Sequence, residues 1–177
     1  MLYFLISSII SLLACVTNMG TCGAKRDNIL VIGDSLACGS KLRMGEVLRK
    51  NESADWECKV GTTIEFWNAG RAKNALDRHQ NTTSVIIFLG TNNYYQTSVP
   101  AVSNILKEIN DRNLKCVWVG NTAVRGKKWP INASLKASVQ PTCTYIDAEN
   151  AGINLPDAIH PSWDSWLILL KMIWSVR

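Results

Sequence analysis

The sequence predicts a three-layer αβα sandwich around a central parallel β-sheet, formed by one domain. Short apolar runs without polar alternation are typical of parallel strands that are covered on both faces. These runs alternate along the chain with stretches whose apolar residues recur at helical spacing, which is the pattern of α/β proteins. The chain has 177 residues, of which 47% are hydrophobic and 19% are charged. This length and composition favour one folded domain with a buried core over a disordered chain.

Strands are predicted where short apolar segments are rich in β-branched or aromatic residues. These segments are residues 28–33, 56–60, 84–89, 116–119 and 144–147. Helices are predicted over residues 41–50, 64–76, 99–113 and 162–176. In the first of these helices, the amphipathic pattern places Leu42, Val47 and Leu48 on the inner face. The last helix carries an apolar stripe of Trp166, Leu169, Leu170 and Ile173.

Residues 1–24 are predicted to form a leader before the folded domain, residues 25–177. Residues 1–16 contain no charged side chain and resemble the apolar part of an export signal. They are too short for a comfortable membrane span, which needs about 20 apolar residues. Cys15 lies where a bacterial lipoprotein signal has its lipidated cysteine, whereas the basic residues that follow from Lys25 favour a retained membrane tether. We expect an exported protein; cleavage, lipidation or retention of the leader, and a cytoplasmic location, remain open.

The charge pattern argues against a nucleic-acid partner, and the cysteine spacing argues against a metal site. The net charge is +5, but the chain has no run of Lys and Arg of the kind that follows a nucleic-acid backbone. The six cysteines form no C-x-x-C pair, so no metal site is expected, and no motif calls for a cofactor. Four cysteines follow the leader: Cys38, Cys58, Cys116 and Cys143. Disulfides would suit an exported protein, but their pairing cannot be read from the sequence.

A candidate nucleophile, Ser35, directly follows the first predicted strand. In open α/β folds, sites form beyond the carboxyl ends of the strands, and Ser35 lies in Gly33-Asp34-Ser35-Leu36 at such an end. Backbone N–H groups at a strand-to-helix turn stabilise negative charge. A Ser hydroxyl is a weak nucleophile, however, and needs a base within hydrogen-bond reach. An ordinary turn with a helix N-cap is an equal explanation for these four residues.

The candidate base is His160, one of the two histidines of the chain. Pro161 follows it and favours an extended or turn conformation just before the last helix. Asp157 lies three residues upstream, where its carboxylate would accept the imidazole Nδ1–H and leave Nε2 facing the nucleophile. Taken alone, this Asp-x-x-His pattern also fits a surface turn.

Two further strand ends carry candidate donors to an oxyanion. Asn92, in Gly90-Thr91-Asn92-Asn93, follows the strand predicted over 84–89, and its amide would stabilise a developing oxyanion. Gly61 follows the strand predicted over 56–60, and its backbone N–H can approach a reacting oxygen closely. An Asx turn that closes a strand is the alternative for Asn92. Each motif is ordinary, but four in this order at strand ends are not.

These four motifs together resemble the SGNH/GDSL hydrolase family, from about residue 28 to the C-terminus. The matching residues are Ser35, Gly61, Asn92 and His160. The resemblance implies a flavodoxin-like sheet, a Ser35–His160–Asp157 triad, an oxyanion hole formed by Ser35, Gly61 and Asn92, and no metal. Asn93 departs from the family pattern, which usually has Asp there, and we expect it to support the turn. The segment from Gly61 to Trp67 resembles small bacterial and phage members.

The expected reaction is the hydrolysis of small acyl esters. The chain is near the minimum size for this fold, which favours O-acetyl groups on carbohydrates over triglycerides. Tyr94 and Trp129 are candidates for stacking on a sugar ring or lining an acyl slot, with core or rim packing as the alternative. A lysophospholipase or thioesterase of the same chemistry is an alternative function. A non-catalytic glycan-binding module is another, but a retired site would not need to keep Ser35, His160 and Asp157.

Overall fold

The computed structural model confirms the three-layer α/β fold around one parallel sheet. It describes residues 26–93, 96, 101–122 and 129–177. The predicted leader and Tyr94 therefore lie outside the described residues. The sheet has five strands in the order β2-β1-β3-β4-β5, and every neighbouring pair is parallel. In the described part of the chain, no helix is long and apolar enough to cross a bilayer.

The strands occupy the segments that the apolar runs predict, with one shift. They are β1 (Asp27–Gly33), β2 (Glu52–Cys58), β3 (Ser84–Phe88), β4 (Lys115–Val119) and β5 (Thr144–Ile146). Strand β1 lies between β2 and β3, and its side chains from Ile29 to Ile32 are buried. Because all strands are parallel, their carboxyl ends lie at one edge of the sheet. This edge receives the residues that follow each strand.

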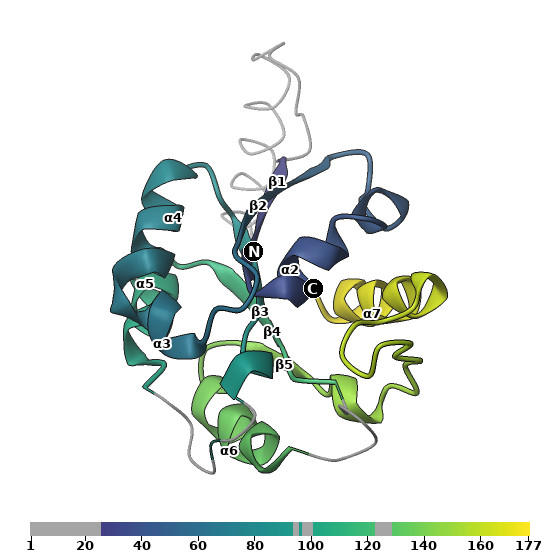
Figure 1. Ribbon diagram of the computed structural model, residues 1–177. Helices are drawn as coiled ribbons and strands as arrows, with labels where there is room; N and C mark the ends of the chain where they lie inside the picture. The colour runs from purple at the N-terminus through teal and green to yellow at the C-terminus, as the bar shows by residue number, and fades with distance from the viewer. Residues whose placement is uncertain (1–25, 94–95, 97–100, 123–128) are drawn as a thin grey trace, which may run out of the picture.

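Helices cover both faces of the sheet (Figure 1). They are α2 (Ser35–Ser40), α3 (Ile64–Phe66), α4 (Ala72–Arg78), α5 (Ser103–Asp111), α6 (Pro130–Val139) and α7 (Trp163–Val176). Apolar residues of α3, α4, α5 and α6 form one core cluster with the sheet, around the fully buried Trp118. Residues of α2 and α7 form the second cluster on the other face, and the predicted stripe from Trp166 to Ile173 is part of it.

The helix predicted over 41–50 is wrong. The helix on this side is α2, which begins at Ser35, and only a short 3-10 turn (Met44–Glu46) lies inside the predicted range. Leu42 is 64% exposed, whereas Val47 and Leu48 do pack against the core. The strand predicted over 56–60 starts earlier, at Glu52, because its register pairs Glu52 with Asp27 of β1. The sequence did not indicate α6, whose N-terminal turn contains Pro130.

The turn between β1 and α2 determines where Ser35 lies. Gly33 has φ +153°, and a Cβ atom there would lie 2.0 Å from the carbonyl oxygen of Phe88. Asp34 follows; its N–H donates to that oxygen, and its side chain caps α2 by accepting from the N–H of Leu36 at 2.9 Å. Burial raises the pKa of Asp34 to about 7, although the Leu36 N–H and the charge of His160 oppose the shift.

Replacing Gly33 by Ala is expected to lower the free energy of unfolding by at least about 2 kcal/mol, because the backbone is strained for any other residue and the new Cβ meets main-chain atoms. Chemical denaturation measures the change. Gly45→Ala is the matched control, since a Cβ at Gly45 meets nothing within 4 Å. Equal stability of the two variants would contradict this account of the turn.

Asp34→Asn is expected to change the pH dependence of stability. Asp34 has a pKa of about 7 when folded and near its ordinary 3.8 when unfolded, so the folded state holds the proton longer. The free energy of unfolding of the wild type therefore falls as pH rises between these values. Relative to wild type, D34N should gain stability across this window and level off above it, as measured by urea denaturation. A constant difference would show that the pKa of Asp34 is not raised.

Candidate active site

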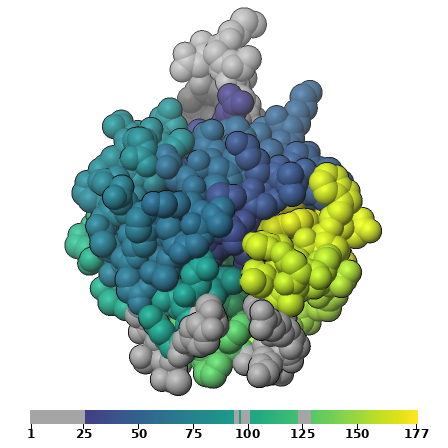
Figure 2. Space-filling model, in the orientation of Figure 1, coloured from purple at the N-terminus to yellow at the C-terminus, as the bar shows by residue number. Residues whose placement is uncertain are grey.

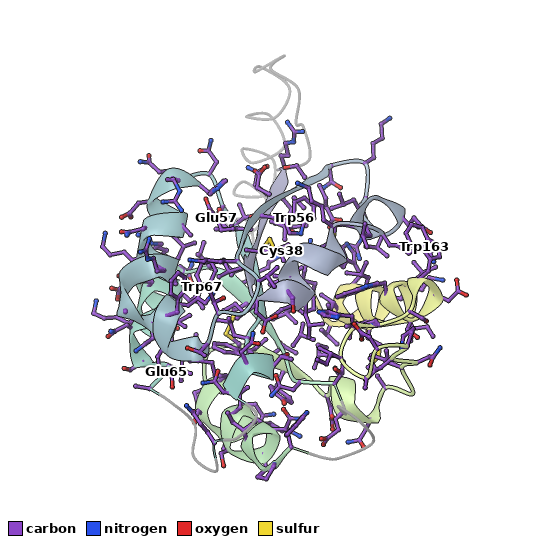
Figure 3. All side chains as sticks on the ribbon, viewed as in Figure 1. Cys38, Trp56, Glu57, Glu65, Trp67 and Trp163 are labelled. Atoms are coloured by element: carbon purple, nitrogen blue, oxygen red, sulfur yellow. A yellow bond between two sulfur atoms is a disulfide. The ribbon has the colours of Figure 1, made fainter. Side chains whose placement is uncertain are left out.

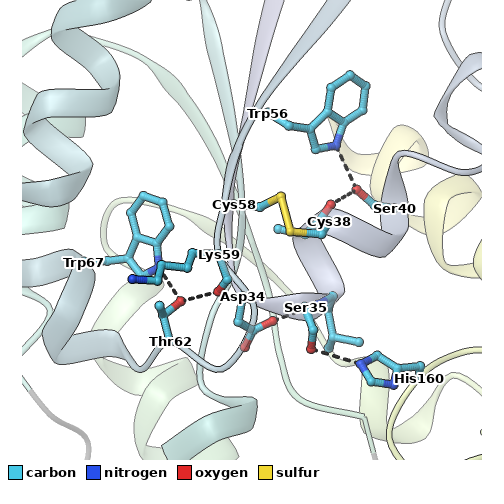
Figure 4. The surroundings of a disulfide bond; sticks show 12 residues. Asp34, Ser35, Cys38, Ser40, Trp56, Cys58, Lys59, Thr62, Trp67 and His160 are labelled. Carbon is cyan, nitrogen blue, oxygen red and sulfur yellow. Dashed lines mark hydrogen bonds between the residues drawn. A yellow bond between two sulfur atoms is a disulfide. The ribbon is translucent and has the colours of Figure 1, made fainter.

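The structure brings Ser35 and His160 together, although they lie 125 residues apart (Figure 4). Ser35 is the first residue of α2, and His160 lies in the loop before α7. The Nε2 atom of His160 is 3.0 Å from Oγ of Ser35. Neither side chain is sealed off, since Ser35 is half-buried and the His160 side chain is 40% exposed. Figure 2 shows the C-terminal segment lying against the segment that contains β1 and α2.

Asp157 orients the imidazole of His160. Its Oδ2 atom lies 2.6 Å from Nδ1, and its Oδ1 atom accepts from the backbone N–H groups of Ile159 and His160. These bonds, the one to the imidazole first, hold the pKa of Asp157 well below its usual range. The carboxylate is therefore ionised at neutral pH. With the proton of neutral His160 on Nδ1, the lone pair of Nε2 faces the Ser35 hydroxyl.

The loop that carries Asp157 and His160 is held by hydrogen bonds from residues that follow β4. Ala158 has a positive φ of 66°, a conformation that costs energy for a non-glycine residue. The Thr122 hydroxyl, after β4, donates to the carbonyl of Ile159 at 3.2 Å. Trp129 supports this contact in turn, because its indole N–H donates to the carbonyl of Thr122 at 3.0 Å. The described contacts of Trp129 are thus with the protein, and its predicted contact with substrate stays a prediction.

Asn92 links the ends of three strands. It lies in the short turn after β3 (Thr91–Asn93), and its Nδ2 atom donates to the carbonyl of Thr62 at 2.9 Å. The same atom lies 3.4 Å from Oδ2 of Asp34, beside Ser35. Gly61 precedes Thr62, is exposed and has φ +75°. Its N–H makes no hydrogen bond within the part of the chain that the structure describes. The three predicted oxyanion donors therefore belong to connected segments.

Asn93 supports the turn, as its departure from the family pattern suggested. It is 2% exposed, and its Oδ1 accepts from the N–H of Ile64 at the start of α3. Its amide N–H donates to Glu65 at 2.8 Å, on the side of the molecule where Figure 3 labels Glu65 and Trp67. Burial would raise the pKa of Glu65, but bonds from Gln96 and Asn93 outweigh it and lower the pKa to about 2. An Asp at position 93 would face this ionised carboxylate.

The four cysteines that the structure describes form two disulfides, a pairing that the sequence left open. Cys38 in α2 is bonded to Cys58 at the end of β2, and Cys116 in β4 is bonded to Cys143 before β5. The first disulfide lies beside the Ser35 turn (Figure 4). Among the described residues, no group of three or more His, Cys, Asp or Glu side chains is placed to hold a metal ion.

Sequence reasoning missed the residues that hold the site in place. Asp34, Thr62 and Thr122 connect the loops that carry the candidate catalytic groups. Asp34 lies inside the Gly33–Leu36 motif and Thr62 directly follows Gly61, which is a weak signal for their role. Thr122 has no such signal, because its role depends on the contact with a loop 37 residues away.

The comparisons with known proteins find likeness in structure alone. No family model and no curated protein sequence matches the chain. The solved structure of TesA superposes with a TM-score of 0.63 at 19% identity, over 84% of this chain and 97% of that one. An acetylxylan esterase, Axe2 from Geobacillus stearothermophilus, gives a TM-score of 0.66 at 14% identity, covering 86% and 94%. A lipase/acylhydrolase from Enterococcus faecalis gives 0.57 at 16% identity, covering 85% and 94%.

These TM-scores establish the fold. Because the identities are low, the activity must be argued from the site. The five parallel strands and the helices on both faces match these neighbours over most of both chains. The chain therefore shares the three-layer α/β fold of these solved structures, the fold that the sequence predicted.

Proposed function

We propose that this protein is a serine esterase, a carboxylic ester hydrolase of the SGNH/GDSL type, that uses Ser35, His160 and Asp157. The observation that carries the proposal is the chain of hydrogen bonds from Ser35 Oγ through the imidazole of His160 to Asp157. This arrangement is the one that activates a Ser hydroxyl for attack on a carbonyl. The fold adds support, since solved structures that share it include an esterase and an acylhydrolase.

In the first step, Nε2 of His160 removes the proton of Ser35 as Oγ attacks the ester carbonyl. The 3.0 Å separation is within the range over which a general base takes a proton. The imidazolium that forms is stabilised by the ionised Asp157, which keeps its own proton-free state because its pKa is lowered. The His160 proton then passes to the leaving alcohol, and an acyl-Ser35 intermediate remains.

The carbonyl oxygen becomes negative during this attack and needs donors. The N–H of Ser35 lies at the start of α2, where no intrahelical partner exists for it. The Gly61 N–H and the Asn92 amide are the other proposed donors. Loss of one such donor typically costs about 10²–10³ in rate. In the second half of the reaction, His160 activates water, which attacks the acyl group and regenerates Ser35. No cofactor takes part in either half.

We propose O-acetyl groups on carbohydrates as the natural substrates. A small chain with this fold offers little surface to enclose a long acyl chain, and Axe2, which shares the fold, is an acetylxylan esterase. The likeness to a lipase/acylhydrolase keeps a lysophospholipase or thioesterase activity as the second candidate. A glycan-binding module without catalysis is disfavoured, because the hydrogen bonds among Ser35, His160 and Asp157 are complete.

We also propose that the protein acts outside the reducing cytoplasm. All four described cysteines are in disulfides, and such bonds persist in oxidising compartments. The leader predicted over residues 1–24 would then serve as an export signal or a membrane tether, and the partner would be an ester substrate rather than a nucleic acid.

Ser35→Ala is expected to reduce kcat for p-nitrophenyl acetate by about 10³-fold or more, because no other group replaces the attacking oxygen. The fold should remain, as monitored by circular dichroism. Ser134→Ala, on the exposed face of α6, is the matched control and should keep wild-type turnover. Wild-type turnover in S35A would refute the role of Ser35.

Substrate preference is tested with a panel of p-nitrophenyl esters of increasing acyl length, acetylated xylo-oligosaccharides and acyl thioesters. We expect kcat/KM to be highest for acetyl and to fall as the acyl chain lengthens, because a chain of this size offers little surface to enclose a long acyl group. Acetate release from the oligosaccharides should be lost in S35A. A preference for long-chain esters or thioesters would favour the second candidate function.

A further inference from the structure

We propose that the Cys38–Cys58 disulfide is a positioning element of the active site. It fixes the helix that carries Ser35 against the loop that carries Gly61, so that the reduced protein is a poor esterase. The inference rests on the proposed function, because it assigns a role in holding two donors for the same oxyanion. It further makes the esterase activity depend on the oxidised state of Cys38 and Cys58, although ester hydrolysis itself involves no oxidation.

The disulfide lies between two elements that carry proposed donors. Cys38 follows Ser35 by three residues, one turn along α2, and Cys58 precedes Gly61 by three residues at the end of β2. The register pairs Cys58 with Gly33, so the bond crosses the carboxyl edge of the sheet beside the nucleophile turn. Figure 4 shows it between this turn and the end of β2.

Each element depends on contacts with its neighbours, among which this bond is the covalent one. The helix α2 has six residues, and a helix this short is not stable by its own hydrogen bonds. The strand β2 is at the edge of the sheet and pairs with β1 alone. Beyond the strand pairing, two hydrogen bonds cross here: Lys59 N–H to Gly33 at 2.9 Å, and the Trp56 indole to Ser40 at 3.2 Å. The disulfide is the covalent link among them.

The far side of the Gly61 loop is fixed to other elements. The hydroxyl of Thr62 accepts from the indole N–H of Trp67, and its carbonyl accepts from Asn92. The loop therefore stays with α3 and β3 if α2 shifts. A shift of α2 would then move the Ser35 N–H away from the other two donors. A misplacement of about 1 Å is enough to cost about 10²-fold in rate.

The second disulfide provides an internal comparison. Cys116 lies near the start of β4 and Cys143 precedes β5, so this bond lies at the amino edge of the sheet, away from the site. The two loops are similar, with sequence separations of 20 and 27, so each bond should stabilise the fold to a similar extent. Cys116 and Cys143 are buried, whereas Cys38 and Cys58 are half-buried.

The test compares C38S/C58S with C116S/C143S in the full chain. For p-nitrophenyl acetate, kcat of C38S/C58S should fall by at least about tenfold, with KM changed by less than about twofold. The inhibition constant of a boronic acid, which forms a tetrahedral anion on Ser35, should rise by the same factor as kcat/KM falls. The melting temperatures of both variants should drop, but kcat of C116S/C143S should stay within about twofold of wild type.

A second arm does not depend on how C38S/C58S folds. The C116S/C143S variant retains Cys38–Cys58, and dithiothreitol reduces this bond: two electrons and two protons convert the disulfide to two thiols, while the dithiol becomes a cyclic disulfide. Activity should fall on reduction and return on reoxidation, with the state of Cys38 and Cys58 followed by alkylation and mass spectrometry. Unchanged kcat with the bond open overturns the inference and leaves the proposed function standing. An inactive oxidised wild type overturns both.

Discussion

The contact on which the site depends is the hydrogen bond between Ser35 and His160, because it joins two ends of the domain that lie 125 residues apart in sequence. Ordering so long a segment costs conformational entropy that one hydrogen bond cannot offset. The burial of two apolar clusters, one on each face of the sheet, supplies the free energy. The second cluster is decisive, because in it α7 packs against α2 and so places the loop before α7 beside the nucleophile.

The parts of the fold that the sequence predicts are those whose signal is local. Strand β3 is apolar on both faces and is readable from residues 84–89 alone, and the stripe of α7 is readable from its spacing. Strand β2 is not, because it is an edge strand in which Asp55 and Glu57 alternate with Ala54 and Trp56. Its start is set by pairing with β1, which no local pattern records. The helix predicted over 41–50 is displaced, since the helix capped by Asp34 begins at Ser35 and already ends at Ser40.

The residues of the candidate site likewise fall into those with a local sequence signal and those whose position depends on distant contacts. Ser35, Gly61 and Asn92 could be proposed because each follows a predicted strand, and His160 because it lies in an Asp-x-x-His-Pro segment before the last helix. Their supports could not, because Thr122 and the partners of each cysteine are known only when distant segments meet. Asn93 is an intermediate case. Its departure from the family pattern was visible, but the reason, a bond to the Glu65 carboxylate, required the contact between β3 and α3.

Two aspartates near Ser35 show that environment, and not proximity to Ser35, decides which carboxylate bonds the imidazole of His160 in an ionised state. Asp34 is adjacent in sequence to Ser35 but fully buried, and burial raises its pKa to about 7. Asp157 is 56% exposed and accepts three hydrogen bonds, which lower its pKa. An ionised carboxylate is required to stabilise an imidazolium at neutral pH, so Asp157 alone fits that task. The carboxyl group of Asp34 instead accepts from the Leu36 N–H and the Asn92 amide, and so connects the turn of Ser35 to a proposed oxyanion donor. In the proposed reaction, the pair would therefore separate two needs: the charge that supports the base and the contacts that hold the proposed donors in place.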